Sequence, residues 1–177
     1  MINSVRLFLF LFLSLVSLPG KEFPVVNFQP AGEITHSTQE ISVLAWLGND
    51  FMLLPQYPQG YVHSIPEGLL PGHIVGEPGA AIVPEKIKFI APDYEKRISG
   101  FEDYKALVFD GNEVFMVMES KQRGIMKGHL TRGFFSPEGQ AIRLTDGPVT
   151  EIEPPVNIDN MAYEAVLLYR DQVITFF

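Results

Sequence analysis

Apolar and polar residues alternate in short runs along most of this chain, and Gly, Pro or Asn separates one run from the next. After Glu40 no stretch shows apolar residues at the period of 3.6 that indicates a helix. The clearest pair of runs covers residues 41–47 and 50–55, and Gly48-Asn49 joins them. Because this dipeptide tolerates the positive φ angles of a hairpin turn, the pattern predicts an all-β protein.

The hairpin pattern occurs three times. A second copy is predicted at residues 104–109 and 113–118 around Gly111-Asn112, and a third lies on both sides of Arg170-Asp171. The copies follow one another at intervals of about 60 residues, a length typical of one blade of a β-propeller.

Each of the first two copies continues into further strands. The second continues into a hairpin from residues 125–135 to residues 141–144, which gives four strands, as in a propeller blade. After the first copy, residues 55–84 are rich in Pro and Gly, so we predict an extended insertion with at most one edge strand. The alternating residues 86–90 predict a half-exposed outer strand that closes this unit.

The pattern therefore predicts a partial β-propeller of about two to three blades. Blade one is expected at residues 40–98, blade two at 99–156 and the start of blade three at 157–177. A propeller ring needs about four to eight blades, so we expect the amino-terminal fragment of a larger ring. A small β-sandwich, in which the hairpins resemble one another by chance, is the alternative.

The amino terminus has the features of a signal peptide, because Arg6 precedes a short uncharged apolar run from Leu7 to Gly20. Residues 1–20 are predicted to be this leader, and residues 21–39 an extension before the first unit. The run is too short for a comfortable membrane span. We expect a periplasmic or extracellular protein, without a stable membrane span once the leader is removed.

The net charge of −8 disfavours a nucleic acid as the partner, because an acidic surface repels phosphate groups. The chain contains no cysteine, so packing and strand pairing must supply its stability.

Acidic residues occur near the first strand of each predicted unit. In a propeller, these positions meet at one mouth of the central channel, where several carboxylates would repel one another unless a cation neutralised them. We therefore expect calcium there. The predicted metal ligands are Glu40, Glu102, Asp103 and Glu164, and the predicted ligand-binding residues are Ser42 and Lys105.

Other polar residues have structural interpretations. The four histidines lack the spacing of zinc ligands and are predicted to lie at the surface or in an interface. Glu119, at the end of a predicted strand, is expected to cap a turn. A solvated outer-strand face is expected for the basic cluster, which comprises Lys121, Arg123, Lys127, His129 and Arg132.

The chain resembles the blade starts of secreted bacterial β-propellers of the esterase-like phytase type in three places: residues 40–46 leading to residues 53–58, residues 101–107 and residues 163–165. The resemblance implies an exported propeller that binds metal and, in its full-length form, hydrolyses phosphoesters. From the sequence we expect an exported binding or scaffold module for a small-molecule or protein ligand of unknown identity. A metal-dependent phosphoester hydrolase is the alternative, and whether the protein is an enzyme stays open.

Overall fold

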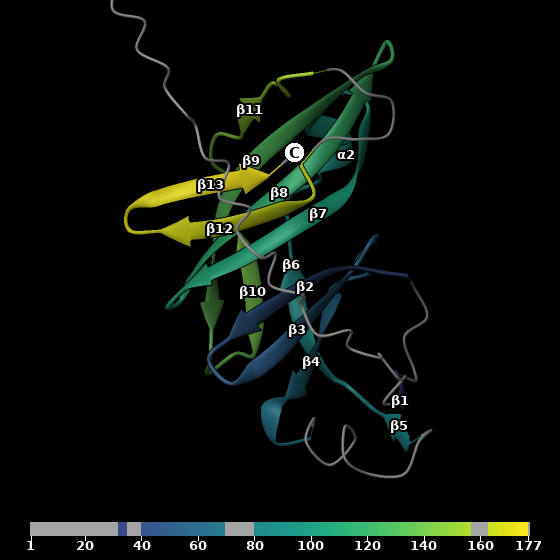
Figure 1. Ribbon diagram of the computed structural model, residues 1–177, viewed down its shortest axis with the longest axis vertical. Helices are drawn as coiled ribbons and strands as arrows, with labels where there is room; N and C mark the ends of the chain where they lie inside the picture. The colour runs from purple at the N-terminus through teal and green to yellow at the C-terminus, as the bar shows by residue number, and fades with distance from the viewer. Residues whose placement is uncertain (1–31, 35–39, 70–79, 157–162, 177) are drawn as a thin grey trace, which may run out of the picture.

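A computed structural model describes residues 32–34, 40–69, 80–156 and 163–176. These residues form an all-β protein (Figure 1), as the sequence predicts, with one short α-helix and one 3-10 turn, Glu67–Leu69. The predicted signal peptide and most of the predicted extension lie outside the described residues.

Two four-stranded antiparallel units make up most of the molecule. The first contains β2 (Ile41–Leu47), β3 (Asp50–Pro55), β4 (Tyr61–Pro66) and β6 (Glu85–Ile90). The second contains β7 (Phe101–Asp110), β8 (Glu113–Gln122), β9 (Ile125–Ser136) and β10 (Ala141–Leu144). The helix α2 (Tyr94–Arg97) lies between the units along the chain, and β11 (Thr150–Ile152) pairs with β9.

The predicted hairpin turns are confirmed. Gly48 and Gly111 have φ angles of 60° and 56°, a region that glycine enters without the clash of a Cβ atom. The turn between β9 and β10 also falls where it was predicted. In the third hairpin, Arg170 takes the positive φ of 55°.

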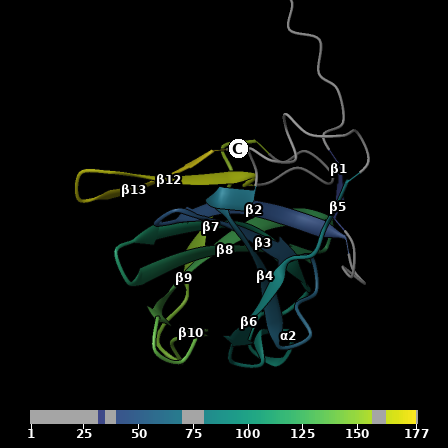
Figure 2. The same cartoon turned by 90° about the horizontal axis from the view of Figure 1, so that it is seen from below.

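The two units join edge to edge into one sheet. Strands β6 and β10 are parallel neighbours, with Lys88 opposite Ala141. At the other end of the sheet β2 lies against β7, where the Ser42 hydroxyl donates to the main-chain oxygen of Tyr104 over 3.1 Å. The result is a nearly closed, barrel-like sheet (Figure 2).

The prediction for residues 55–84 was wrong in one respect. Instead of an edge strand at most, β4 is an internal strand between β3 and β6, and β5 (Ala80–Ile82) pairs with β1 (Gly32–Ile34). Residues 61–65 contain neither Pro nor Gly, so every residue there can donate a ladder hydrogen bond. Likewise, β6 alternates as predicted but has a neighbour on each side.

The barrel interior is apolar and draws on both units. Leu54 and Val62 come from the first unit, and Met116 and Ile142 from the second; all four are fully buried and belong to one cluster. Tyr94 of α2 belongs to this cluster, and its hydroxyl oxygen lies 3.1 Å from Oγ1 of Thr131. Packing of one core by both units makes them a single structural body.

A third hairpin, β12 (Ala165–Tyr169) and β13 (Gln172–Phe176), packs on the outer face of β7 and β8. Tyr163 anchors it in a second cluster with Ala106, Val117 and Met126. The turn end of the hairpin projects beyond the barrel (Figure 2). The hairpin is thus an accessory layer and not a strand pair of the barrel.

Candidate functional site

Three ionisable side chains meet on the outer face of β7 and β8. Asp103 lies directly opposite Glu119 in the strand register, and a β-bulge inserts Lys105 between Tyr104 and Ala106. The Lys105 Nζ atom lies 3.3 Å from Asp103 Oδ2 and 3.4 Å from Glu119 Oε2. Both carboxyl groups are buried, with 3% of Asp103 and 2% of Glu119 exposed, whereas Lys105 is partly exposed.

The hydrogen bonds of this cluster are incomplete. Gln56 Nε2 donates to Asp103 Oδ2 over 2.8 Å. Asp103 Oδ1 and Glu119 Oε1 are buried and have no hydrogen-bond partner in the described part of the chain. A buried acceptor without a partner costs about 1–3 kcal/mol, and more when it is charged. The cluster therefore keeps unused capacity to accept hydrogen bonds.

Burial controls the acid–base properties of the cluster. It raises the pKa of Glu119 to about 7, because the loss of solvent outweighs the attraction of Lys105, and the nearby Asp103 and Glu164 raise it further. Burial alone would lower the pKa of Lys105, but the attraction of Asp103 and Glu119 is stronger, so the pKa is raised. Glu119 thus titrates close to neutral pH while Lys105 stays charged.

An open pocket of about 680 Å³ adjoins the cluster. Its lining contains three carboxylates and one cation, together with an exposed tyrosine. Glu95 and Glu102 have no ion-pair partner among the described residues. The lining residues are Gln56, Tyr57, Glu95, Gly100, Phe101, Glu102, Asp103 and Lys105. The pocket is therefore acidic.

The structure brings together part of the predicted site. Asp103 and Lys105 are in contact, Glu102 lines the same pocket, and the charge of Glu164 acts on Lys105. Glu40 is exposed, and its main-chain oxygen accepts a hydrogen bond from the main-chain N–H of Gln56.

The described residues contain no group of three or more His, Asp or Glu side chains arranged to hold a metal ion. Ser42, predicted to bind a ligand, is engaged at the junction of β2 and β7, where its hydroxyl lies within 3.4 Å of two main-chain oxygens.

The expectation for Glu119 was wrong. Its carboxyl group caps no turn but is buried opposite Asp103. The sequence places Glu119 beside Ser120 and Lys121 at a strand end, where a polar residue is usually exposed. Only the pairing of β7 with β8, with its bulge at Lys105, brings Lys105 near Glu119. The predicted turn at Gly111-Asn112 sets the register only as far as Ala106 and Val117, and without the bulge Glu119 would lie opposite Tyr104.

The expectation for the histidines was wrong where they are described. His63 and His129 are both buried, and burial lowers the pKa of each, so both are neutral at pH 7. His129 Nε2 lies 2.7 Å from the Ser120 hydroxyl. Since Ser120 is fully buried, this pair joins β8 to β9 and does not face a substrate. His36 and His73 lie outside the described residues.

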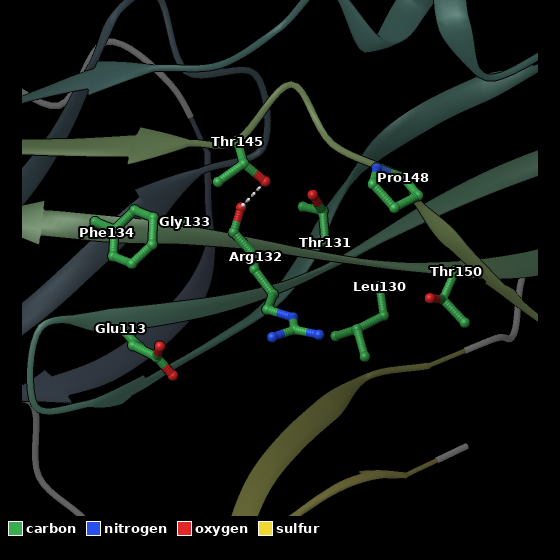
Figure 3. Close-up of a pocket in the computed structure, with 9 residues that line it drawn as sticks. All are labelled: Glu113, Leu130, Thr131, Arg132, Gly133, Phe134, Thr145, Pro148 and Thr150. Atoms are coloured by element: carbon green, nitrogen blue, oxygen red, sulfur yellow. Dashed lines mark hydrogen bonds between the residues drawn. The ribbon is translucent and has the colours of Figure 1, made fainter.

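The predicted basic cluster is divided in the structure. Lys127 is paired with Glu151, and His129 is buried, whereas Arg132 is exposed and lines a separate pocket (Figure 3). Figure 3 shows Glu113 and three threonines around the same space as Arg132. Thr145 donates to the Arg132 main-chain oxygen over 3.0 Å. With an acid beside its one arginine, this pocket has mixed charge.

The fold and the site define an all-β, barrel-like protein with an acidic pocket on its outer surface. In the described residues no helix is both long and apolar enough to cross a membrane.

No protein-family model matches the chain, and no curated protein matches it. Among solved structures, the chain is similar to one described as the crystal structure of the computationally designed Ika4 protein. The two are 11% identical, the match covers 84% of this chain and 92% of that one, and the TM-score is 0.29.

Proposed function

We propose that this protein is an exported binding module and that the acidic pocket beside Asp103 takes a cationic ligand. One observation carries the proposal: Asp103 lines the pocket, is almost fully buried and keeps one carboxylate oxygen without a partner. Buried charges are normally paired and hydrogen-bonded, and those that are not often belong to functional sites.

The charge of the pocket agrees with this proposal. Glu95, Glu102 and Asp103 contribute three negative charges when ionised, and Lys105 contributes one positive charge. Lys105 also lies near Glu119, so it cannot neutralise all the carboxylates at once. A bound cation would restore the balance and could donate hydrogen bonds to an oxygen that now lacks them.

Of the expected propeller, we keep only its division into four-stranded units. The two four-stranded units correspond in sequence to blades one and two, and here they share one sheet. The alternative function, metal-dependent phosphoester hydrolysis, needs several carboxylates available to one ion. Because Asp103 and Glu119 contact a lysine instead, binding is the function that we propose. Calcium, the expected ion, is one cation to be tested.

Titration calorimetry of the full chain with methylammonium, guanidinium and calcium chloride tests this function. We expect saturable binding of at least one of these cations, weakened about tenfold or more by Asp103→Asn, since tenfold corresponds to about 1.4 kcal/mol. Glu138→Gln, in the exposed turn after β9, is the matched control and should bind as the original chain does. Equal binding by Asp103→Asn and the original chain, or none of any cation, would contradict the proposal.

A further inference from the structure

The acidic pocket adjoins an aromatic one. A second cavity of about 260 Å³ shares Tyr57, Glu95 and Phe101 with the first. Its other lining residues are Pro58, Gln59, Pro92, Asp93, Tyr94 and Tyr104. The two cavities therefore adjoin at these three residues, and we call them together the groove, with a carboxylate-rich half beside Asp103 and an aromatic half beside Tyr57.

Tyr57 is the aromatic residue best placed to contact a ligand. It lies at the junction of the two halves, is 54% exposed and makes no ring contact within the described residues. The ring of Phe101, by contrast, packs edge-on against Tyr104 at a centroid distance of 5.5 Å. Within the groove, the Tyr57 ring is therefore exposed and the Phe101 ring is packed against Tyr104.

The charges of the aromatic half also favour a cation. Asp93 is engaged by Lys96 through an ion pair of 2.5 Å, so the carboxylate left available there is Glu95, which both halves share. Among the described residues that line the aromatic half there is no lysine, arginine or histidine. Carboxylates in both halves of the groove would repel an anion.

We infer that the groove binds an organic ammonium ion that carries an apolar body. The inference rests on the proposed function, and it names the class of ligand. The ammonium group would lie by Asp103 and Glu102, where it could donate to the carboxylates. The apolar body would lie against the rings of Tyr57 and Phe101. A bare metal ion would leave the aromatic half unfilled.

Three probes separate the contributions of charge and apolar body: phenethylammonium has both, methylammonium has the charge alone, and phenethyl alcohol has the apolar body alone. We expect calorimetry of the full chain to show phenethylammonium binding at least tenfold more tightly than either of the others. Tyr57→Ala should weaken phenethylammonium about 2- to 12-fold, the range of a contact between two aromatic rings, and leave methylammonium nearly unchanged. Tyr57→Phe, which keeps the ring, is the matched control.

The outcomes distinguish the inference from the function on which it rests. If methylammonium binds as tightly as phenethylammonium and Asp103→Asn weakens both, the cation-binding function stands and the inference about the apolar body is wrong. If phenethyl alcohol binds as tightly as phenethylammonium, charge has no part and the inference is wrong. If no cation binds, both proposals fail. Since Tyr57 is exposed, far-UV circular dichroism should show both Tyr57 variants folded.

Discussion

At the scale of single residues, Glu119 shows how burial changes the pKa of a carboxyl group. It has a lysine within 3.4 Å, yet burial still raises the pKa of its carboxyl group to about 7. Loss of solvent disfavours the ionised form of Glu119, and Lys105 favours it. The loss of solvent has the larger effect, because Lys105 is also shared with Asp103. Glu119 is therefore partly protonated near neutral pH, and the charge of the cluster depends on pH.

This property predicts a stability that depends on pH. The folded-state pKa lies above the unfolded value of about 4.5, so the folded protein binds the extra proton, and stability falls as pH rises from about 4.5 through 7. Glu119→Gln removes this loss, and we expect it to be more stable than the original chain at pH 8 by about 1–3 kcal/mol. Urea denaturation at pH 4.5, 6 and 8 measures the difference.

The matched control is the exposed Glu113→Gln, for which we expect the pH dependence of the original chain. A stability difference between Glu119→Gln and the original chain that stays constant from pH 4.5 to 8 would contradict the assignment.

Sequence reasoning could reach part of this cluster. Asp103 and Lys105 could be proposed because they lie at the start of a strong predicted strand. Their contact with Glu119 depends on the register of β7 and β8 and on a bulge at Lys105, and the bulge has no signal in the chain. The unpaired oxygen of Asp103 depends on packing around it, which no local pattern encodes.

At the scale of elements, the hairpin β12–β13 is held to the barrel through a close contact with a glycine. A Cβ atom on Gly128 would lie 2.3 Å from Cδ2 of Tyr163, well inside van der Waals contact. Tyr163 can pack on β9 only because this position has no side chain. Its hydroxyl also donates to the main-chain oxygen of Glu153 over 2.9 Å, which ties it to the segment after β11.

We therefore predict that Gly128→Ala displaces Tyr163 and loosens the hairpin while the barrel stays folded. Hydrogen exchange should become at least tenfold faster in β12 and β13, with smaller changes in β3 and β4. Gly68→Ala is the matched control, because an added Cβ there meets nothing within 4 Å, and it should leave the exchange of the hairpin unchanged. Unchanged exchange in Gly128→Ala would show that Tyr163 is not the anchor.

Strand pairs between residues close together in the sequence were easier to predict than pairs between distant residues. Hairpins with a Gly-Asn turn are local, and the sequence located β2, β3, β7 and β8. The parallel pairing of β6 with β10 joins residues about 50 positions apart, with no turn to specify it. Burial of β4 was missed because the prolines on both sides of it suggested an open loop, although its interior has none.

At the scale of the whole molecule, the two four-stranded units share one core. Leu54 of β3 and Ile142 of β10 belong to the same buried cluster, although they come from different units. Neither unit can lose its packing without exposing the apolar face of the other. The barrel should therefore unfold as one cooperative body.

Trp46 makes this cooperativity measurable, because it is the single tryptophan and lies in the first unit. Ile142→Ala, in the second unit, leaves a cavity and should lower the free energy of unfolding by about 2–5 kcal/mol. We expect Trp46 fluorescence and far-UV circular dichroism to report this loss with one shared urea midpoint. Ile125→Ala, at an exposed site, should change stability by less than about 0.5 kcal/mol. Two separate midpoints would show that the units fold independently.

The position of β2 against β7 has a consequence for the protein in concentrated solution. These strands are the two ends of the main sheet, and each would otherwise offer a row of free backbone donors and acceptors to any neighbouring molecule. By lying against each other, they cover the edges from which intermolecular strand addition and aggregation start. The hydrogen bond from Ser42 to Tyr104 thus helps to keep both edges covered as well as to hold the barrel together.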